Sequence, residues 1–513
     1  MRKTLQWDEV DYVLAARQGV VANATDSSAF SALDFLRFVI AKFKNQPFSE
    51  FPDYHEDHDV FNLRHSHPPL LHYVLAMLGP QRLKPGHETE LRLLQFSGAA
   101  LLIATILWGY LKISENPTLP GLAAVSAVGV LCGFFLGRDL NCHLWIAVSL
   151  IFTSLSVGQF LAQPVRRNGI AAGSFIGLNF LGLQTGVFVA FWAVIAVGIA
   201  ILLSPEKMSE NNQKLNFRKM FTTWVIRSVW MLIGFMALVL VAYPGAFLRL
   251  SLLRIFALYA FLIIKGNEYS GVSSRYSGYI SLVFPLLILG VTSLIRLVFQ
   301  NRSPRWYLAL ATSVIGFGYG LILLKFLLNI TYITPALALF GVLGMAAISS
   351  WKKPVVDMSV AIGLMAFTVF RMTTYPASSN HYTIQNFQQL ADILGSRQAL
   401  IEGGHILKYY EPQVAADVVS VKVSGDQKTL IRRDTRKLQY NPVTPDQLAG
   451  SIVILRTFNN MPQYEWEKHL PANVRKLQVA GIEGAIYEFP TVSPNPSKAD
   501  SAPPDHSQSP SNP

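Results

Sequence analysis

The feature that most constrains the fold is a series of long apolar runs. Between residues 92 and 371, runs of about 17–25 apolar residues alternate with short loops rich in Lys, Arg, Pro and Asn. This is the length that a helix needs to cross the hydrocarbon core of a bilayer. Because the runs are continuously hydrophobic, they predict helices and not the strands of a barrel. With 51% hydrophobic and 14% charged residues, the 513-residue chain is predicted to be an α-helical polytopic membrane protein.

We expect about ten spans in a membrane module over residues 92–371. They are predicted at 92–113, 119–137, 143–162, 170–183, 185–203, 225–243, 278–299, 305–325, 328–349 and 354–370. Lys and Arg exceed Asp and Glu by 43 to 31, and this surplus indicates membrane topology, not nucleic acid binding. Cys132 and Cys142 form neither a disulfide framework nor a metal-binding spacing.

The basic loops predict which side each end of the chain occupies. Four clusters of Lys and Arg should face the cytoplasm, at 166–167, 207–219, 296–305 and 352–353. They share one side only if residues 168–203 form two short helices that turn at 182–186. In addition, residues 244–278 must stay outside as an interfacial segment. On this topology, residues 1–91 and everything after Arg371 lie on the outer side.

Regions of different composition flank the membrane module. Residues 1–91 are predicted to form an outer loop with interfacial helices, one of which begins near Pro68-Pro69. Residues 375–490 are predicted to form a small extramembrane α/β domain. It has helical spacing at 384–394 and strand-like segments at 399–401, 418–423, 451–456 and 484–489. The tail at 491–513 is rich in Pro and Ser and is predicted to be disordered.

Three polar groups lie where outer loops meet predicted spans, at 8–12, 64–70 and 137–143. If the first group is helical, Asp8, Asp11 and Tyr12 share one side of the helix, and Glu9 lies about 100° away. The two neighbouring carboxylates, Asp8 and Glu9, would then have different tasks.

In motif order, residues 6–345 resemble the polyprenyl-phosphate-dependent glycosyltransferases of the GT-C fold, which include protein O-mannosyltransferases and lipid A aminoarabinose transferase. Four runs carry the resemblance: Trp-Asp-Glu at 7–9, His-Pro-Pro-Leu at 67–70, Leu-Arg-Leu at 91–93 and Tyr-x-x-Pro at 332–335. The run 138–143 is loosely similar to a further outer-loop motif of that family. The family also has a span before the acidic motif, so we expect a span upstream of the seven residues that precede Asp8.

The resemblance implies sugar transfer from a polyprenyl-phosphate-linked donor to a glycan, lipid or protein acceptor at the outer face of the plasma (inner) membrane. Such a reaction needs a base for the acceptor hydroxyl and cationic groups for the departing phosphate. Asp8 is the predicted base, and Glu9 is its orienting partner or a metal ligand. The candidates for the donor phosphate are Arg64, His65, His67, Arg138 and Lys265, and further site candidates are Asp11, Tyr12 and Asp139.

A divalent cation is a possible cofactor. His55, Asp57 and Asp59 have suitable ligand types, although a solvated acidic loop explains them as well, because their spacing is not diagnostic. Two other functions stay open. A transporter or flippase should carry ionisable residues near mid-span, where this sequence is nearly all apolar. A non-enzymatic scaffold would instead use the outer α/β domain to bind a partner.

Overall fold

A computed structural model of the 513-residue chain describes most of the predicted membrane module and most of the predicted C-terminal α/β domain. The described residues are 4–5, 8–21, 40, 44, 68–183, 185–203, 213–248, 276–299, 302–323, 330–374, 382–424, 427–434, 439–456, 463–479 and 482–491. The chain divides into two compact units. The first comprises Met1–Thr383 and Thr435–Leu438, and the second comprises Ile384–Asp434 and Gln439–Pro513.

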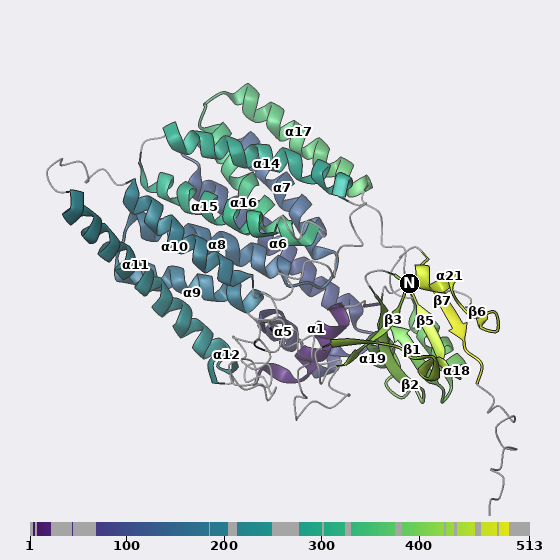
Figure 1. Ribbon diagram of the computed structural model, residues 1–513. Coiled ribbons are helices and arrows are strands. Elements are labelled where there is room, and N and C mark those ends of the chain that lie inside the picture. Colours follow the sequence, from purple (N-terminus) through teal and green to yellow (C-terminus); the bar gives the residue numbers. More distant parts are fainter. Residues whose placement is uncertain are drawn as a thin grey trace, which may run out of the picture. The chain divides into compact units, whose positions relative to one another are not determined.

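The first unit is a bundle of long helices (Figure 1). Each of the ten predicted apolar segments is helical. The helices are α6 (Glu88–Ile113), α7 (Leu119–Gly137), α8 (His143–Ala162), α9 (Arg166–Gly182), α10 (Gly186–Leu202), α11 (Gln213–Ala242), α14 (Tyr276–Phe299), α15 (Pro304–Leu323), α16 (Ile330–Ser349) and α17 (Pro354–Thr374). Among the described residues, six helices are long and apolar enough to cross a membrane. The prediction of an α-helical polytopic membrane protein is confirmed; the number of crossings stays a prediction.

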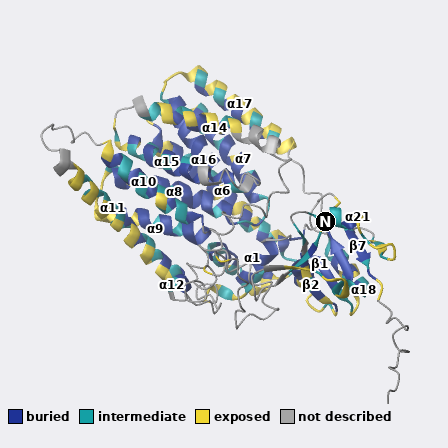
Figure 2. Ribbon diagram, in the orientation of Figure 1, coloured by how far each residue is buried: buried dark blue, intermediate teal, exposed yellow. Residues whose placement is uncertain are grey.

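Burial separates the centre of the bundle from its rim (Figure 2). The apolar window of α16, at Tyr332–Ser349, is 94% buried, whereas the windows of α11 and α17 are 17% and 22% buried. Apolar side chains on both α11 and α17 are exposed, among them Leu240, Val241 and Val369. In a bilayer such faces contact lipid, so α16 forms the core and α11 and α17 form the lipid-facing rim.

Glycines allow the closest helix packing in the bundle. A Cβ on Gly173 of α9 would lie 1.9 Å from the Met231 carbonyl oxygen, and one on Gly234 of α11 would lie 2.0 Å from the Ile170 oxygen. Only hydrogen fits at these two positions, so the backbones of α9 and α11 lie in direct contact. The predicted break between two short helices is also present, because α9 ends at Gly182 and α10 begins at Gly186.

Short helices lie at one end of the bundle, which we call the α1 end. They are α1 (Asp8–Arg17), α5 (Leu70–Ala76) and the 3-10 helix η3 (Pro80–Leu83). The Tyr73 hydroxyl of α5 donates a hydrogen bond to the Ala242 carbonyl oxygen at 2.6 Å. This bond fixes α5 to the last turn of α11, whose carbonyl groups have no partner within their own helix. The four-residue helix α12 (Gly245–Leu248) follows α11.

The second unit is an α/β domain built on a seven-stranded sheet of order β4-β3-β2-β1-β5-β7-β6. Its strands are β1 (Gln398–Glu402), β2 (Asp417–Val423), β3 (Leu430–Asp434), β4 (Gln439–Pro442), β5 (Ile452–Leu455), β6 (Arg475–Val479) and β7 (Ile482–Glu488). Strand β1 is parallel to its neighbours β2 and β5, and the other pairs are antiparallel. The helices are α18 (Ile384–Leu394), α19 (Gly404–Tyr410), α20 (Pro445–Leu448) and α21 (Glu465–Lys468). The predicted C-terminal α/β fold is thus confirmed.

Candidate active site

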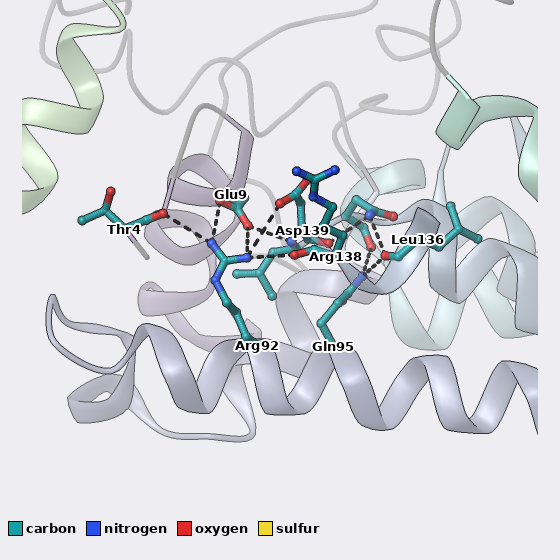
Figure 3. A network of polar contacts seen from close by, with 9 residues as sticks. Thr4, Glu9, Arg92, Gln95, Leu136, Arg138 and Asp139 are labelled. Atoms are coloured by element: carbon teal, nitrogen blue, oxygen red, sulfur yellow. Dashed lines mark hydrogen bonds and ion pairs between the residues drawn. The ribbon is translucent and has the colours of Figure 1, made fainter. Parts of the chain in front are cut away.

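Glu9, the second residue of α1, forms a buried ion pair with Arg92 of α6 (Figure 3). The Glu9 residue is 5% exposed, and its Oε1 lies 3.1 Å from Arg92 Nη1. Arg92 Nη2 donates to Glu9 Oε2 at 3.2 Å, and the Leu140 N–H donates to Oε1 at 2.9 Å. Both carboxylate oxygens therefore accept charge-assisted hydrogen bonds, which stabilise the ionised form of a buried carboxylate.

Arg92 also contacts two other segments. Its Nη1 donates to the Arg138 carbonyl oxygen at 3.0 Å, and its Nη2 contacts the Thr4 carbonyl oxygen at 3.3 Å. Asp139 Oδ1 lies 3.8 Å from Nη1. One guanidinium thus links the segment before α1, α1 itself and the loop between α7 and α8. A planar group with five N–H donors can serve several acceptors in this way.

The loop between α7 and α8 carries two of the predicted site residues, Arg138 and Asp139. Its backbone is held by Glu9, Arg92 and Gln95, whereas the Asp139 side chain is 51% exposed. Within the loop, Asn141 Nδ2 donates to the Leu136 carbonyl oxygen at 2.8 Å, and Asn141 Oδ1 accepts from Leu144 N at 3.2 Å. The loop therefore presents a solvent-accessible carboxylate from a fixed backbone.

Tyr12 and two later segments meet beside this loop. The Tyr12 hydroxyl lies 3.5 Å from Cys142 Sγ, and its ring centroid lies 6.0 Å from that of His72 on α5. Asp11, the preceding residue of α1, is 6% exposed. Residues separated by up to 130 positions in sequence thus come together at the α1 end.

Aromatic and hydroxyl side chains of the long helices also contact one another at the α1 end of the bundle. The His143 and Tyr332 rings lie 4.3 Å apart in an edge-to-face arrangement, joining α8 to α16. The Thr185 and Tyr319 hydroxyls are 3.2 Å apart, which joins the residue before α10 to α15. Sequence reasoning did not select His72, Thr185 or Tyr319 as site residues. Each of the three is a polar residue in or at the end of an apolar run.

Several predicted site residues lie outside the described part of the chain. They are Arg64, His65, His67 and Lys265 for the donor phosphate, and His55, Asp57 and Asp59 for a metal ion. Asp8 is the first residue of α1, and only its backbone is described. Within the described ranges, no group of three or more His, Cys, Asp or Glu side chains could hold a metal ion. Glu9, Asp11, Tyr12, Arg138 and Asp139 all lie at the α1 end.

An apolar surface groove adjoins the Glu9–Arg92 pair. It is lined by Thr89, Arg92, Leu93 and Phe96, all on α6. Leu93 is 64% exposed and Phe96 is 69% exposed, so hydrocarbon can contact both side chains. The groove therefore places lipid-accessible surface next to the charged network.

The second unit contains its own buried polar network, at the ends of β1 and β5. Glu402 is 6% exposed and accepts hydrogen bonds from the Arg456 backbone N–H at 2.8 Å and from the Tyr464 hydroxyl at 3.1 Å. The Arg456 guanidinium binds both oxygens of Glu467 instead, at 2.8 and 3.1 Å. The Tyr487 hydroxyl also donates to Glu467, at 2.8 Å. Burial raises the pKa of Glu402, and the two hydrogen bonds only partly oppose this effect.

No protein-family model and no curated protein matches the chain. The solved structures that are similar to it include two glycosyltransferases, each bound to a polyprenyl phosphate. The archaeal oligosaccharyltransferase AglB from Archaeoglobus fulgidus, in complex with an inhibitory peptide and a dolichol-phosphate, has a TM-score of 0.39 and 12% sequence identity, with 80% of this chain and 64% of AglB covered. ArnT from Cupriavidus metallidurans, bound to undecaprenyl phosphate, has a TM-score of 0.45 and 12% identity, with 94% of each chain covered. The chain thus spans just under two thirds of the length of AglB.

Proposed function

We propose that the protein is a membrane glycosyltransferase of the GT-C type. In this proposal, the α1 end transfers a hexosyl or pentosyl group from a polyprenyl-phosphate-linked donor to an acceptor. The observation that carries the proposal is the convergence of motifs that are far apart in sequence. Glu9 binds Arg92 and Leu140, Tyr12 meets His72 and Cys142, and His143 meets Tyr332.

The residues at the α1 end have distinct roles in this proposal. Asp8 is the general base that takes the proton of the acceptor hydroxyl, while Glu9, held by Arg92, fixes the start of α1. Arg138 stabilises the charge that develops on the departing donor phosphate, together with Arg64, His65, His67 and Lys265. The groove beside Arg92 would receive part of the polyprenyl chain.

Donor cleavage by full-length protein in liposomes tests the proposal. The donors are undecaprenyl-phosphate-linked hexose and aminopentose, an extract of native membranes supplies the acceptor hydroxyl that takes the sugar, and the release of undecaprenyl phosphate is measured. We expect Asp8→Asn to lower turnover by about 10²–10⁴-fold, the usual contribution of a positioned base. Asp446→Asn, at an exposed position in α20, is the matched control and should retain full turnover. Unchanged turnover in Asp8→Asn, or no release from either donor by the wild type, would contradict the proposal.

We also propose that the α1 end and the C-terminal domain face the outside of the plasma (inner) membrane. Single cysteines introduced at positions 57 and 427, in a variant lacking Cys132 and Cys142, should react with an impermeant thiol reagent added outside intact cells. A cysteine at position 214 should react only after the cells are opened. Labelling of position 214 from outside would refute this orientation.

A further inference from the structure

We infer that Gln95 is a positioning residue of the proposed site. It holds both ends of the loop between α7 and α8, and so keeps Arg138 and Asp139 in place beside Glu9 and Arg92 (Figure 3). The inference rests on the proposed function for its catalytic consequence. Its structural consequence can be tested separately.

Gln95 lies three residues after Arg92 on α6, so the two side chains project from the same face of the helix. Gln95 is 1% exposed. Its Nε2 donates to the Leu136 carbonyl oxygen at 2.9 Å and to the Asn141 carbonyl oxygen at 3.3 Å. Leu136 belongs to the last turn of α7, and Asn141 lies two residues before α8. A single amide group thus spans the loop.

The chemistry of this position favours a neutral side chain with two donors. The carbonyl groups in the last turn of α7 have no partner within their helix, and buried acceptors require donors from elsewhere. A lysine or arginine at position 95 could donate too, but it would add a second cation one turn from Arg92. The amide of Gln95 donates to both carbonyl groups without changing the charge of the network, and Asn141 Nδ2 is a second donor to the Leu136 carbonyl oxygen.

Gln95 completes a set of backbone anchors along the loop. Arg92 holds the Arg138 carbonyl group, and Glu9 holds the Leu140 N–H. The anchors are on the backbone, while the Asp139 side chain stays 51% exposed and accessible to a substrate. Because Gln95 is buried under this loop, it acts through the position of the backbone and does not touch the substrate.

Gln95→Met tests this role, because methionine preserves the volume and removes both donors. We expect amide hydrogen exchange of residues 136–144 to become at least about tenfold faster. We also expect kcat to fall by about 10–100-fold, as for other misplacements of about 1 Å, while KM for the undecaprenyl-phosphate-linked donor changes less than about threefold. Gln95→Asn, whose amide is one methylene shorter, should give the same changes to a smaller extent, and it serves as the test variant if Gln95→Met does not fold.

Thr105→Val is the matched control on the same helix. Thr105 is 3% exposed, and its hydroxyl donates only to the Leu101 carbonyl oxygen within α6. Loop exchange and kcat in Gln95→Met equal to those in Thr105→Val would overturn the inference. If the wild type cleaves no donor, the proposed function fails, but loop exchange alone still decides whether Gln95 anchors the loop. Unchanged loop exchange would overturn that role whatever the turnover.

Discussion

Glu9 at the α1 end and Glu402 in the second unit are buried to nearly the same extent but have different partners. Glu9 is 5% exposed and Glu402 is 6% exposed. Glu9 lies 3.1 Å from a guanidinium group, whereas Glu402 accepts hydrogen bonds from a backbone N–H and a tyrosine hydroxyl. The Arg456 guanidinium donates instead to both carboxylate oxygens of Glu467.

This difference shows that burial alone does not determine what a carboxylate does for a fold. A carboxylate that faces a cation is stabilised in its charged form and becomes a structural link. A carboxylate that faces neutral donors keeps much of its desolvation cost, and its pKa is raised. Replacing the charged carboxylate by a neutral group should therefore lower the free energy of unfolding at Glu9 and raise it at Glu402.

The largest effect is expected from Arg92→Met, which leaves Glu9 buried without its cation. Removing one partner of a buried ion pair typically costs about 3–5 kcal/mol, so the free energy of unfolding of the first unit should fall by a comparable amount. Thermal unfolding of the full-length protein in detergent measures the loss. The double variant with Glu9→Gln should recover part of the loss, because it removes the carboxylate charge that Arg92 no longer balances. A loss below about 1 kcal/mol would mean that solvent reaches Glu9.

The next largest effects are expected from neutralising each carboxylate in turn, which should change the stability of the two units in opposite directions. Glu9→Gln should destabilise the first unit by about 1–3 kcal/mol, because it removes the nearer and more buried of the two carboxylates beside the Arg92 guanidinium. Glu402→Gln should stabilise the second unit by about 1 kcal/mol, because an amide oxygen in the place of Oε2 can still accept from Arg456 N–H and from the Tyr464 hydroxyl, which is 3.4 Å from that oxygen, without the cost of a buried charge. Hydrogen exchange resolves the two units within one sample. If both variants changed the free energy of unfolding of their units in the same direction, the proposed difference between Glu9 and Glu402 would be wrong.

The stability of the second unit should depend on pH through Glu402. The folded-state pKa of Glu402 is raised above its ordinary value of 4.5, so the folded state binds this proton more tightly than the unfolded state. Its contribution is fully present below pH 4.5 and is lost as the pH rises through the folded-state pKa. Denaturant titrations followed by hydrogen exchange of residues 398–402 should therefore show falling stability above pH 4.5. Glu402→Gln should remove this component of the slope.

Tyr464→Phe is expected to have the smallest effect, about 0.5–1.5 kcal/mol of destabilisation, the usual net value of one hydrogen bond. The Tyr464 hydroxyl donates to Glu402 at 3.1 Å, and its loss should raise the pKa of Glu402 further. The matched variant Tyr487→Phe removes a donor to Glu467, which retains both hydrogen bonds from Arg456. Equal pH profiles for the two variants would show that Tyr464 does not control the charge of Glu402.

Most of the helical architecture could be predicted because it depends on local composition. Long apolar runs can satisfy their backbone in a membrane only as helices, and all ten runs are helical. Four predicted strand segments correspond to β1, β2, β5 and β7, but β3, β4 and β6 were missed. The missed strands lie at or next to the edges of the sheet, where charged residues, such as the half-buried Arg432 and the exposed Arg475, replace the apolar run that identifies a central strand.

The sequence by itself determined the membrane helices, the C-terminal α/β domain and the polar segments that are candidates for a site, because these follow from the composition and periodicity of neighbouring residues. Only the tertiary structure decided which side chains pair. Glu9 and Arg92 are 83 positions apart, and Tyr12 and Cys142 are 130 apart. Such contacts depend on how the helices pack, and packing is set by shape over the whole bundle. For the same reason, the partners of Glu402 and Gln95 could not be read from the sequence next to them.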